Sequence, residues 1–190
     1  NEFVKKSTEY YSSYQSYKLM QETSLLLDDL SNWYVRRNRR RFWKSENDAD
    51  KLIAYDTLYS SLVTIIKVMA PIIPFLTEEI YNNLVFRLIP DSPESIHLCD
   101  FPEYDSSIAD NELINEIDTV ISIVKMGRSA RNKANLKIRQ PLESISIYAD
   151  NDFIQLGLNN KDQILEELNI KKINACKNIE DLVQFNIKPN

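Results

Sequence analysis

The sequence contains very little glycine, histidine or cysteine. Its two glycines, Gly127 and Gly157, lie too far apart to form a glycine-rich loop that binds nucleotide phosphates. One histidine, His97, cannot supply a zinc site that needs several histidines. The two cysteines, Cys99 and Cys176, form no CxxC pair, so we expect free thiols in a reducing compartment, the cytoplasm. These absences exclude several common kinds of catalytic site.

The chain also lacks long apolar runs. Uninterrupted apolar stretches extend over only a handful of residues, which predicts no transmembrane helix, and the first residues lack the apolar segment of a signal peptide. The sequence begins with Asn1 instead of Met, so we expect a piece of a longer polypeptide. An apolar content of 43% is nevertheless enough for a core in one or two domains.

Charge is unevenly distributed along the chain. The net charge is -5, which by itself disfavours a nucleic-acid partner. However, residues 36–44 (RRNRRRFWK) and 125–139 (KMGRSARNKANLKIR) carry 12 of the 23 cations and no acid. The remaining 166 residues have a local net charge of -17. We call these two stretches the first and second basic segments, and we interpret them as candidate interaction surfaces on an acidic body.

Apolar spacing of three and four residues predicts a helical bundle over most of the chain. Proline interrupts the pattern at Pro71 and Pro74 because it lacks the amide hydrogen that a helix needs. Asn47 or Asp48 is the expected N-cap of the helix that follows the first basic segment. The predicted helices are 2–11, 14–43, 49–69, 75–88 and 111–132, with a long connection over 90–109.

The pattern changes after Pro141. LESISIYA alternates apolar and polar residues and is rich in β-branched side chains, which is typical of a strand. We expect a helix over 162–168 and further strands near 171–175 and 183–187. The predicted fold is therefore mainly α: a helical bundle over 1–140, followed by a small, incomplete α+β piece over 141–190.

The first basic segment carries residue types that suit single-stranded RNA. At about 100° per residue, five side chains share roughly a third of the helix circumference: Asn32, Arg36, Arg39, Arg40 and Trp43. Guanidinium groups pair with phosphates, an amide can read a base edge, and an indole offers a stacking surface. Arg37 and Arg41 fall on the apolar side, where we expect ion pairs inside the bundle, and Trp33 continues the apolar stripe.

The second basic segment offers further phosphate contacts, although a solvated helix face explains it almost as well. The candidate RNA-binding residues here are Lys125, Arg128 and Arg131. Lys137 and Arg139 alternate with apolar residues, so both could project to one side of an extended segment. We expect no catalytic residue and no metal site, because His97 and Cys99 lack further ligands and the adjacent pairs Glu78-Glu79 and Glu166-Glu167 do not converge.

The residues of both basic segments resemble a known family. DDLSNWYVRRNRRRFW resembles the helix that follows the catalytic core in the isoleucyl-tRNA synthetase family of class I aminoacyl-tRNA synthetases. Four later stretches agree in order: DKLIAYDTLY, MAPIIPFLTEEIYNNL, SIHLCDFPEYD and GRSARNKANLKIRQPL. The resemblance covers nearly the whole chain. Valyl-tRNA synthetases share the bundle, but the amino-acid sequences of the first and last stretches are more similar to the isoleucine family.

The resemblance implies an anticodon-binding bundle from an enzyme that joins isoleucine to tRNA(Ile) with ATP and magnesium. In related bundles a tryptophan at this helix end meets the anticodon loop, and Trp43 is the matching position. The expected partners are the tRNA(Ile) anticodon stem-loop and the catalytic domain of the same polypeptide, in a monomer without membrane contact. HIGH-like and editing segments are absent from the chain, so these 190 residues should be non-catalytic and hold no cofactor.

Two alternatives remain. Residues 125–129 (KMGRS) resemble the KMSKS loop that holds ATP phosphates in class I synthetases, but they continue the periodicity of a helix and no parallel-sheet pattern precedes them. We therefore predict a helix end with a basic face. For the whole chain, the alternative function is a structural helical domain whose basic segments bind an acidic protein, or the equivalent bundle of a valyl-tRNA synthetase.

Overall fold

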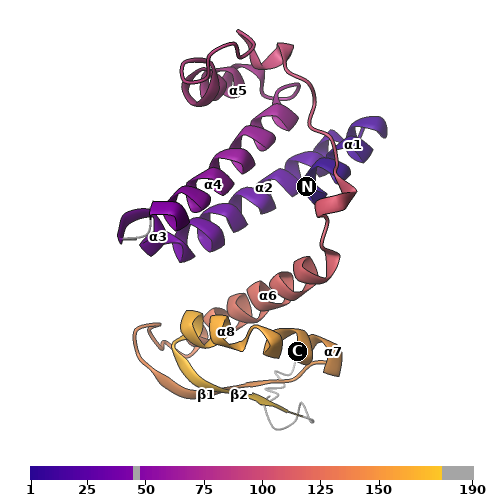
Figure 1. Cartoon of the computed structure of the whole chain (residues 1–190). Coiled ribbons are helices and arrows are strands. Elements are labelled where there is room, and N and C mark those ends of the chain that lie inside the picture. The colour runs from indigo at the N-terminus through magenta and orange to yellow at the C-terminus, as the bar shows by residue number, and fades with distance from the viewer. Residues whose placement is uncertain (45–47, 177–190) are drawn as a thin grey trace. The chain divides into compact units, whose positions relative to one another are not determined.

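The computed structural model describes residues 1–44 and 48–176 and divides into two compact units, 1–109 and 110–190. Both units are rich in helix, and the one sheet among the described residues has two strands (Figure 1). This confirms a mainly α fold with a small α+β part. The expected cap at Asn47 and the expected strand over 183–187 lie outside the described residues.

The first unit is a bundle of helices with a long connection. Tyr14, in the left-handed conformation with φ 55°, separates the first two helices, and Pro74 begins α5, where its missing amide costs nothing. These positions agree with the sequence-based prediction within two or three residues. The helical elements are α1 (Glu2–Ser12), α2 (Ser16–Asp29), η1 (Leu30–Val35), α3 (Arg39–Lys44), α4 (Asp48–Met69), α5 (Pro74–Tyr81), η2 (Asn82–Phe86), η3 (Ile96–Leu98) and η4 (Ser106–Ile108).

Helix α4 organises the core of this unit. Its C-terminal half supplies Ile65, Val68 and Met69 to a cluster with α1 and α2, and Ile66 to a second cluster with α5. Its N-terminal half differs from the sequence-based prediction, because Leu52 and Tyr55 are exposed and not part of a buried stripe. There its neighbours include the short helix α3 and Tyr34 of η1, and these short elements leave apolar residues of α4 uncovered.

Helix α4 is also the one described helix that is long and apolar enough to cross a membrane, judged by length and composition alone. Core helices of helical bundles have the same properties. Because its C-terminal half contributes to both core clusters, we interpret α4 as the central helix of the bundle.

The second unit is a parallel βααβ arrangement behind a long helix. Strand β1 (Leu142–Ile147) pairs in parallel with β2 (Ile170–Ala175), and α6 (Asn111–Lys133), α7 (Asn151–Asn159) and α8 (Lys161–Leu168) lie on one face of the sheet (Figure 1). Sequence analysis missed α7, although Asp150 caps it by accepting a hydrogen bond from the Phe153 amide at 2.8 Å.

The packing divides between Ala109 and Asp110, earlier than the boundary near 140 expected from the change of pattern. The reason is that α6 buries Val120, Ile123 and Val124 in a unit whose other buried residues include Ile164 and Leu168 of α8. The helix is therefore part of the α+β unit in packing terms, even though its sequence looks like the end of a bundle.

Candidate nucleic-acid interface

The first basic segment lies at the end of a nearly continuous helical rod. Helix α2 runs into the π-helical segment η1, and a turn at Asn38 leads into α3. The Asn38 side chain donates to the Tyr34 carbonyl at 2.8 Å, which holds the rod together across this turn. A π segment adds residues to each turn, so an ideal α-helical projection no longer describes the face that follows.

The five side chains predicted for this face are nevertheless all exposed: Asn32, Arg36, Arg39, Arg40 and Trp43. Trp43 has 67% of its surface exposed, and the Arg39 guanidinium carbon lies 5.5 Å from the centre of its ring. Such a distance allows a cation–π contact. The structure thus places a large exposed indole and three exposed guanidinium groups along one short stretch of helix.

Two of these residues are fixed on their own helix. Asn32 donates its amide to the Asp28 carboxylate at 2.6 Å, and the Arg36 Nε donates to the Asn32 carbonyl oxygen at 2.7 Å. The bond of its Nε orients the exposed Arg36 side chain along the helix. This arrangement reduces the conformational entropy that a phosphate contact would cost.

Arg41 joins α3 to α4, as expected from its place on the apolar side. Its Nε and Nη2 donate to the two carboxylate oxygens of Asp50 at 2.8 and 2.6 Å, and Nη1 donates to the Asn38 side chain. The hydrogen bond with Arg41 is the main cause that lowers the pKa of Asp50, and the same bond raises the pKa of Arg41. The predicted structural ion pair of Arg41 is therefore confirmed.

Trp33 and Arg37 form a separate contact on the rod. The Arg37 guanidinium carbon lies 4.9 Å from the centre of the Trp33 ring, and both residues are half-buried. Trp33 is therefore less buried than a core position on the apolar stripe would be. The expected pairing of Arg37 with a carboxylate remains a prediction, whereas its stacking on Trp33 is observed.

The second basic segment lies on α6 and the loop that follows it. KMGRS is helical, as predicted, because α6 continues to Lys133. Gly127 allows this helix to approach its neighbour closely, since a Cβ there would lie 2.5 Å from a methyl group of Leu168. The segment is thus a packed helix and has no loop conformation that could wrap a phosphate.

The three candidate cations on α6 have different surroundings. Lys125 is exposed, whereas Arg128 is half-buried and forms an ion pair with Glu167 of α8. Arg131 is only 5% exposed, and its guanidinium donates to four carbonyl oxygens at 2.7 to 3.1 Å. Burial removes Arg131 from the side chains that could reach a phosphate, and we assign it a structural role.

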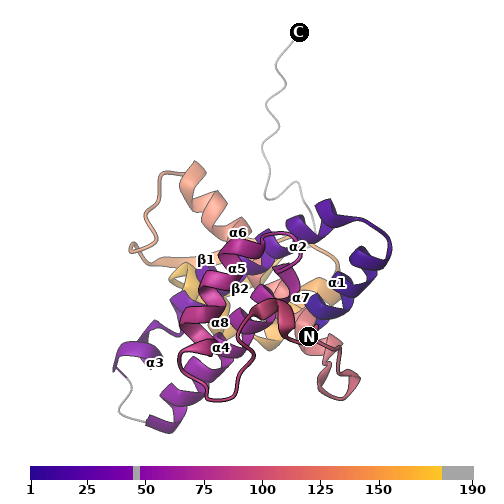
Figure 2. The ribbon, with the colours of Figure 1, turned by 90° about the horizontal axis from the view of Figure 1, so that it is seen from above.

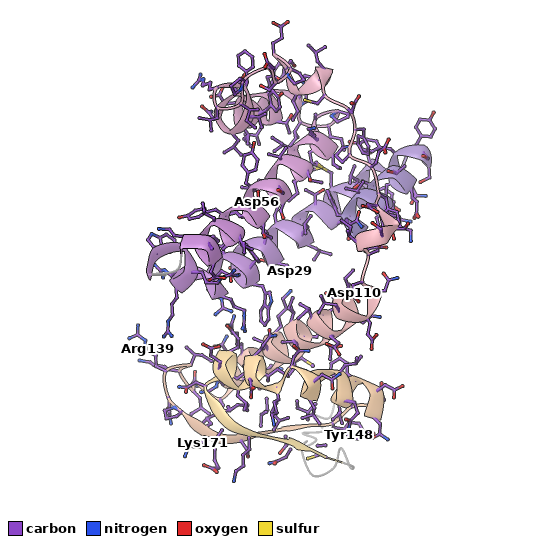
Figure 3. All side chains as sticks on the ribbon, in the orientation of Figure 1. Asp29, Asp56, Asp110, Arg139, Tyr148 and Lys171 are labelled. Atoms are coloured by element: carbon purple, nitrogen blue, oxygen red, sulfur yellow. The ribbon has the colours of Figure 1, made fainter. Side chains whose placement is uncertain are left out.

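Lys137 and Arg139 do not form the extended segment that their alternation indicated. The Gln140 amide donates to the Lys137 carbonyl at 3.0 Å, so these residues lie in a turn between α6 and β1. Both side chains are exposed, and Figure 3 shows Arg139 on this loop. The turn is stabilised by two side chains that donate hydrogen bonds to its carbonyl groups: Arg131 to that of Lys137 and Asn169 to that of Ile138.

The remaining polar candidates stabilise the connection after α5. Glu78, one of an adjacent acidic pair, accepts hydrogen bonds from the Ser95 hydroxyl and the Ile96 amide at 2.9 and 3.0 Å. The Cys99 thiol lies 3.4 Å from the Tyr81 hydroxyl, while His97 is exposed. Within residues 1–44 and 48–176, no three His, Cys, Asp or Glu side chains gather where they could hold a metal ion.

The fold defines the class of protein first: a helical bundle with a small α+β unit and an exposed basic face at a helix end. Residues 1–147 match the family described as anticodon-binding domain of tRNA ligase, and the chain belongs to that family. Similar curated proteins are isoleucine–tRNA ligases. That of Clostridium novyi is 49% identical over all 190 residues, and that of Thermus thermophilus is 40% identical over 166 residues, 87% of this chain. The chain spans 18% and 16% of their lengths.

Proposed function

We propose that this chain is the part of an isoleucine–tRNA ligase that binds the anticodon stem-loop of tRNA(Ile). Membership of the anticodon-binding family supports the binding role, and the names of the similar proteins support isoleucine as the amino acid. The observation that carries the proposal is the exposed Trp43 beside Arg36, Arg39 and Arg40. An acidic protein partner would also meet the cations, but an exposed indole is better used by an unstacked base.

In this proposal the guanidinium groups neutralise phosphates of the loop, and Trp43 stacks on a base that leaves the anticodon stack. Lys125, on the other unit, is a further candidate for a phosphate contact because its side chain is exposed, whereas Arg131 is buried. Recognition here positions the RNA and involves no bond formation. We propose residues 1–140 as the recognition module, which adds α6 of the second unit to the first unit.

We infer that the ATP and magnesium of the parent enzyme bind outside this chain. The KMGRS stretch is helical, and the part of the chain that the structure describes contains no group of three metal-ligating side chains. We therefore place ATP binding, isoleucine activation and editing in the rest of the polypeptide, which would act in the cytoplasm as a monomer. The catalytic domain of that polypeptide is the second expected partner of this chain.

The test is binding of the 190-residue chain to tRNA(Ile) and to a tRNA(Ile) with a replaced anticodon loop. Trp43→Ala should weaken cognate binding about tenfold, because stacking of one base on an aromatic ring contributes about 1–3 kcal/mol. Phe75→Ala is the matched control, since Phe75 is a 90% exposed ring on α5, at the other end of α4 (Figure 1). Equal affinity for both RNAs, or unchanged affinity of Trp43→Ala, contradicts the proposal.

A further inference from the structure

Four aromatic rings meet at the junction of α3 and α4. Phe42 lies at the centre and is only 4% exposed. Its ring centre lies 6.3 Å from that of Tyr34, 6.2 Å from that of Trp43 and 5.0 Å from that of Tyr55. Distances of this size are typical of packed aromatic pairs. We call these four residues the aromatic junction.

Two rings of the aromatic junction remain accessible from outside. Trp43 is 67% exposed and Tyr55 is 46% exposed, although both pack against the same buried ring. They belong to different helices, α3 and α4, which lie side by side at this end of the unit (Figure 1 and Figure 2). The two exposed rings therefore share one buried neighbour, Phe42, although they belong to different helices.

The aromatic junction is held from both sides. The Tyr34 hydroxyl donates to the Ala54 carbonyl at 3.0 Å, and the Arg41 guanidinium binds both carboxylate oxygens of Asp50. The first bond fixes η1, and the second fixes α3, on the first turns of α4. Trp43 and Tyr55 are consequently positioned before any ligand arrives, which lowers the entropic cost of stacking on them.

We propose that Tyr55 is a second base-stacking residue, so that the aromatic junction receives two unstacked bases of a single-stranded RNA loop. This inference rests on the proposed function and extends it. The charges favour RNA as the occupant, because Arg36, Arg39 and Arg40 are exposed while Asp50 is neutralised by Arg41. An exposed ring beside cations, as Trp43 is beside Arg39, is a combination that binds single strands, with bases on rings and phosphates on cations, and Tyr55 would supply a second ring.

The experiment uses Trp43 as its own reporter. The chain has two tryptophans, so Trp33→Phe leaves Trp43 as the sole indole, and its fluorescence follows the titration with an anticodon stem-loop RNA of tRNA(Ile). In this background Tyr55→Ala should weaken binding about tenfold, whereas Tyr55→Phe, which keeps the ring, should stay within about twofold. Tyr148→Ala is the control, because Tyr148 is a 49% exposed tyrosine on the other unit.

Two further measurements separate stacking from folding and from charge. Tyr55→Leu keeps apolar packing on Phe42 without a ring, so it should fold and still lose affinity about tenfold. The salt dependence of binding should be unchanged in Tyr55→Ala and Tyr55→Leu, because a lost stack releases no counterions. A lower salt slope would mean that Tyr55 acts through phosphate contacts, and it would overturn the proposal.

The inference and the proposed function fail in different ways. Trp43→Ala lacks the reporter, so its binding is measured by filter binding, which needs no fluorescence. If Trp43→Ala binds more weakly while Tyr55→Leu and Tyr55→Ala bind as tightly as the parent, only the second stacking position is refuted. If neither the parent chain nor any variant distinguishes the cognate loop from a replaced one, the proposed function itself is refuted. Affinity retained in Tyr55→Phe and lost in both Tyr55→Ala and Tyr55→Leu supports the inference.

Discussion

Replacing Arg131 with methionine should destabilise the second unit strongly and leave RNA binding almost unchanged. The Arg131 guanidinium donates through Nη1 to the carbonyls of Lys137 and Gln140, and through Nη2 to those of Leu168 and Asn169. It therefore joins α6 to the following loop and to the end of α8. Its positive charge also lies at the C-terminal end of α8, where the helix dipole is negative.

The magnitude follows from the number of bonds and the size of the unit. A hydrogen bond from a charged donor contributes about 1.5–3 kcal/mol, but the four bonds share one group and methionine refills part of its volume. We expect a loss of about 3–5 kcal/mol, as for other broken buried networks. A unit of this length holds only about 4–12 kcal/mol in total. At about 4–8 °C per kcal/mol, its thermal midpoint should fall by more than about 10 °C.

The assay can follow the two units separately because both tryptophans lie in the first. In Arg131→Met the far-ultraviolet circular dichroism transition should begin earlier, while the tryptophan fluorescence transition keeps its midpoint. Binding of tRNA(Ile), measured below the first transition, should stay within about twofold of the parent, because a buried arginine releases no counterions. Arg131→Lys is the control: it keeps the charge, but one ammonium cannot reach four carbonyls. An unaltered unfolding curve together with a large loss of RNA affinity would show that Arg131 binds phosphate and would refute the structural role.

Three further changes test the packing. Gly127→Ala should destabilise the second unit by about 1–2 kcal/mol in thermal unfolding, because its Cβ would lie 2.5 Å from buried Leu168 and the gain in helix propensity offsets only about 1 kcal/mol. Gly157→Ala should cost less, since its Cβ would lie close to one atom only, the Ile123 δ-methyl at 2.6 Å, whereas a Cβ at Gly127 would crowd both methyl groups of Leu168 and that of Ile145; equal losses at both glycines would contradict this reasoning. Burial raises the pKa of Tyr81 to about 12, so stability from its neutral phenol is present below about pH 10 and is lost as the pH rises toward 12. Urea midpoints across this range should fall more steeply for the parent than for Tyr81→Phe, which keeps the contribution of Tyr11, whose pKa burial also raises; parallel curves would refute the effect.

The helices could be predicted because their sequence pattern is local. The apolar spacing before Lys133 and the capping side chain of Asp110, which accepts from the Leu113 amide at 2.9 Å, both lie within a few residues of the ends of α6. Helix α7 was not predicted from the sequence because Gly157 weakens its helical pattern. The reason for a glycine at this position is a contact with α6: the Ile123 side chain, from a distant part of the chain, packs where a Cβ would lie.

The direction in which side chains point was less predictable than the elements. Tyr55 continues the apolar spacing of α4, yet it is exposed because its neighbours are a short helix and a single buried ring, Phe42. Spacing states which residues share a face, and it does not state whether another element covers that face. Tyr55 can therefore be identified as a candidate stacking residue only from the packing of α3 on α4.

The two basic segments show why charge alone does not identify a phosphate-binding surface. Both are free of acids, so neither contains a local partner that would neutralise its cations. In the first segment, Arg41 finds its carboxylate nine residues away at Asp50, and three other arginines stay exposed. In the second, Arg128 pairs with Glu167 and Arg131 with the end of α8, partners more than thirty residues along the chain. An acid-free stretch thus has two physical explanations: its cations face a polyanion, or they are neutralised by groups that only the fold brings near. Exposed cations occur in both segments, including Lys125, Lys137 and Arg139 in the second. The exposed indole of Trp43 occurs only in the first basic segment, and it favours that segment as the site where RNA would bind.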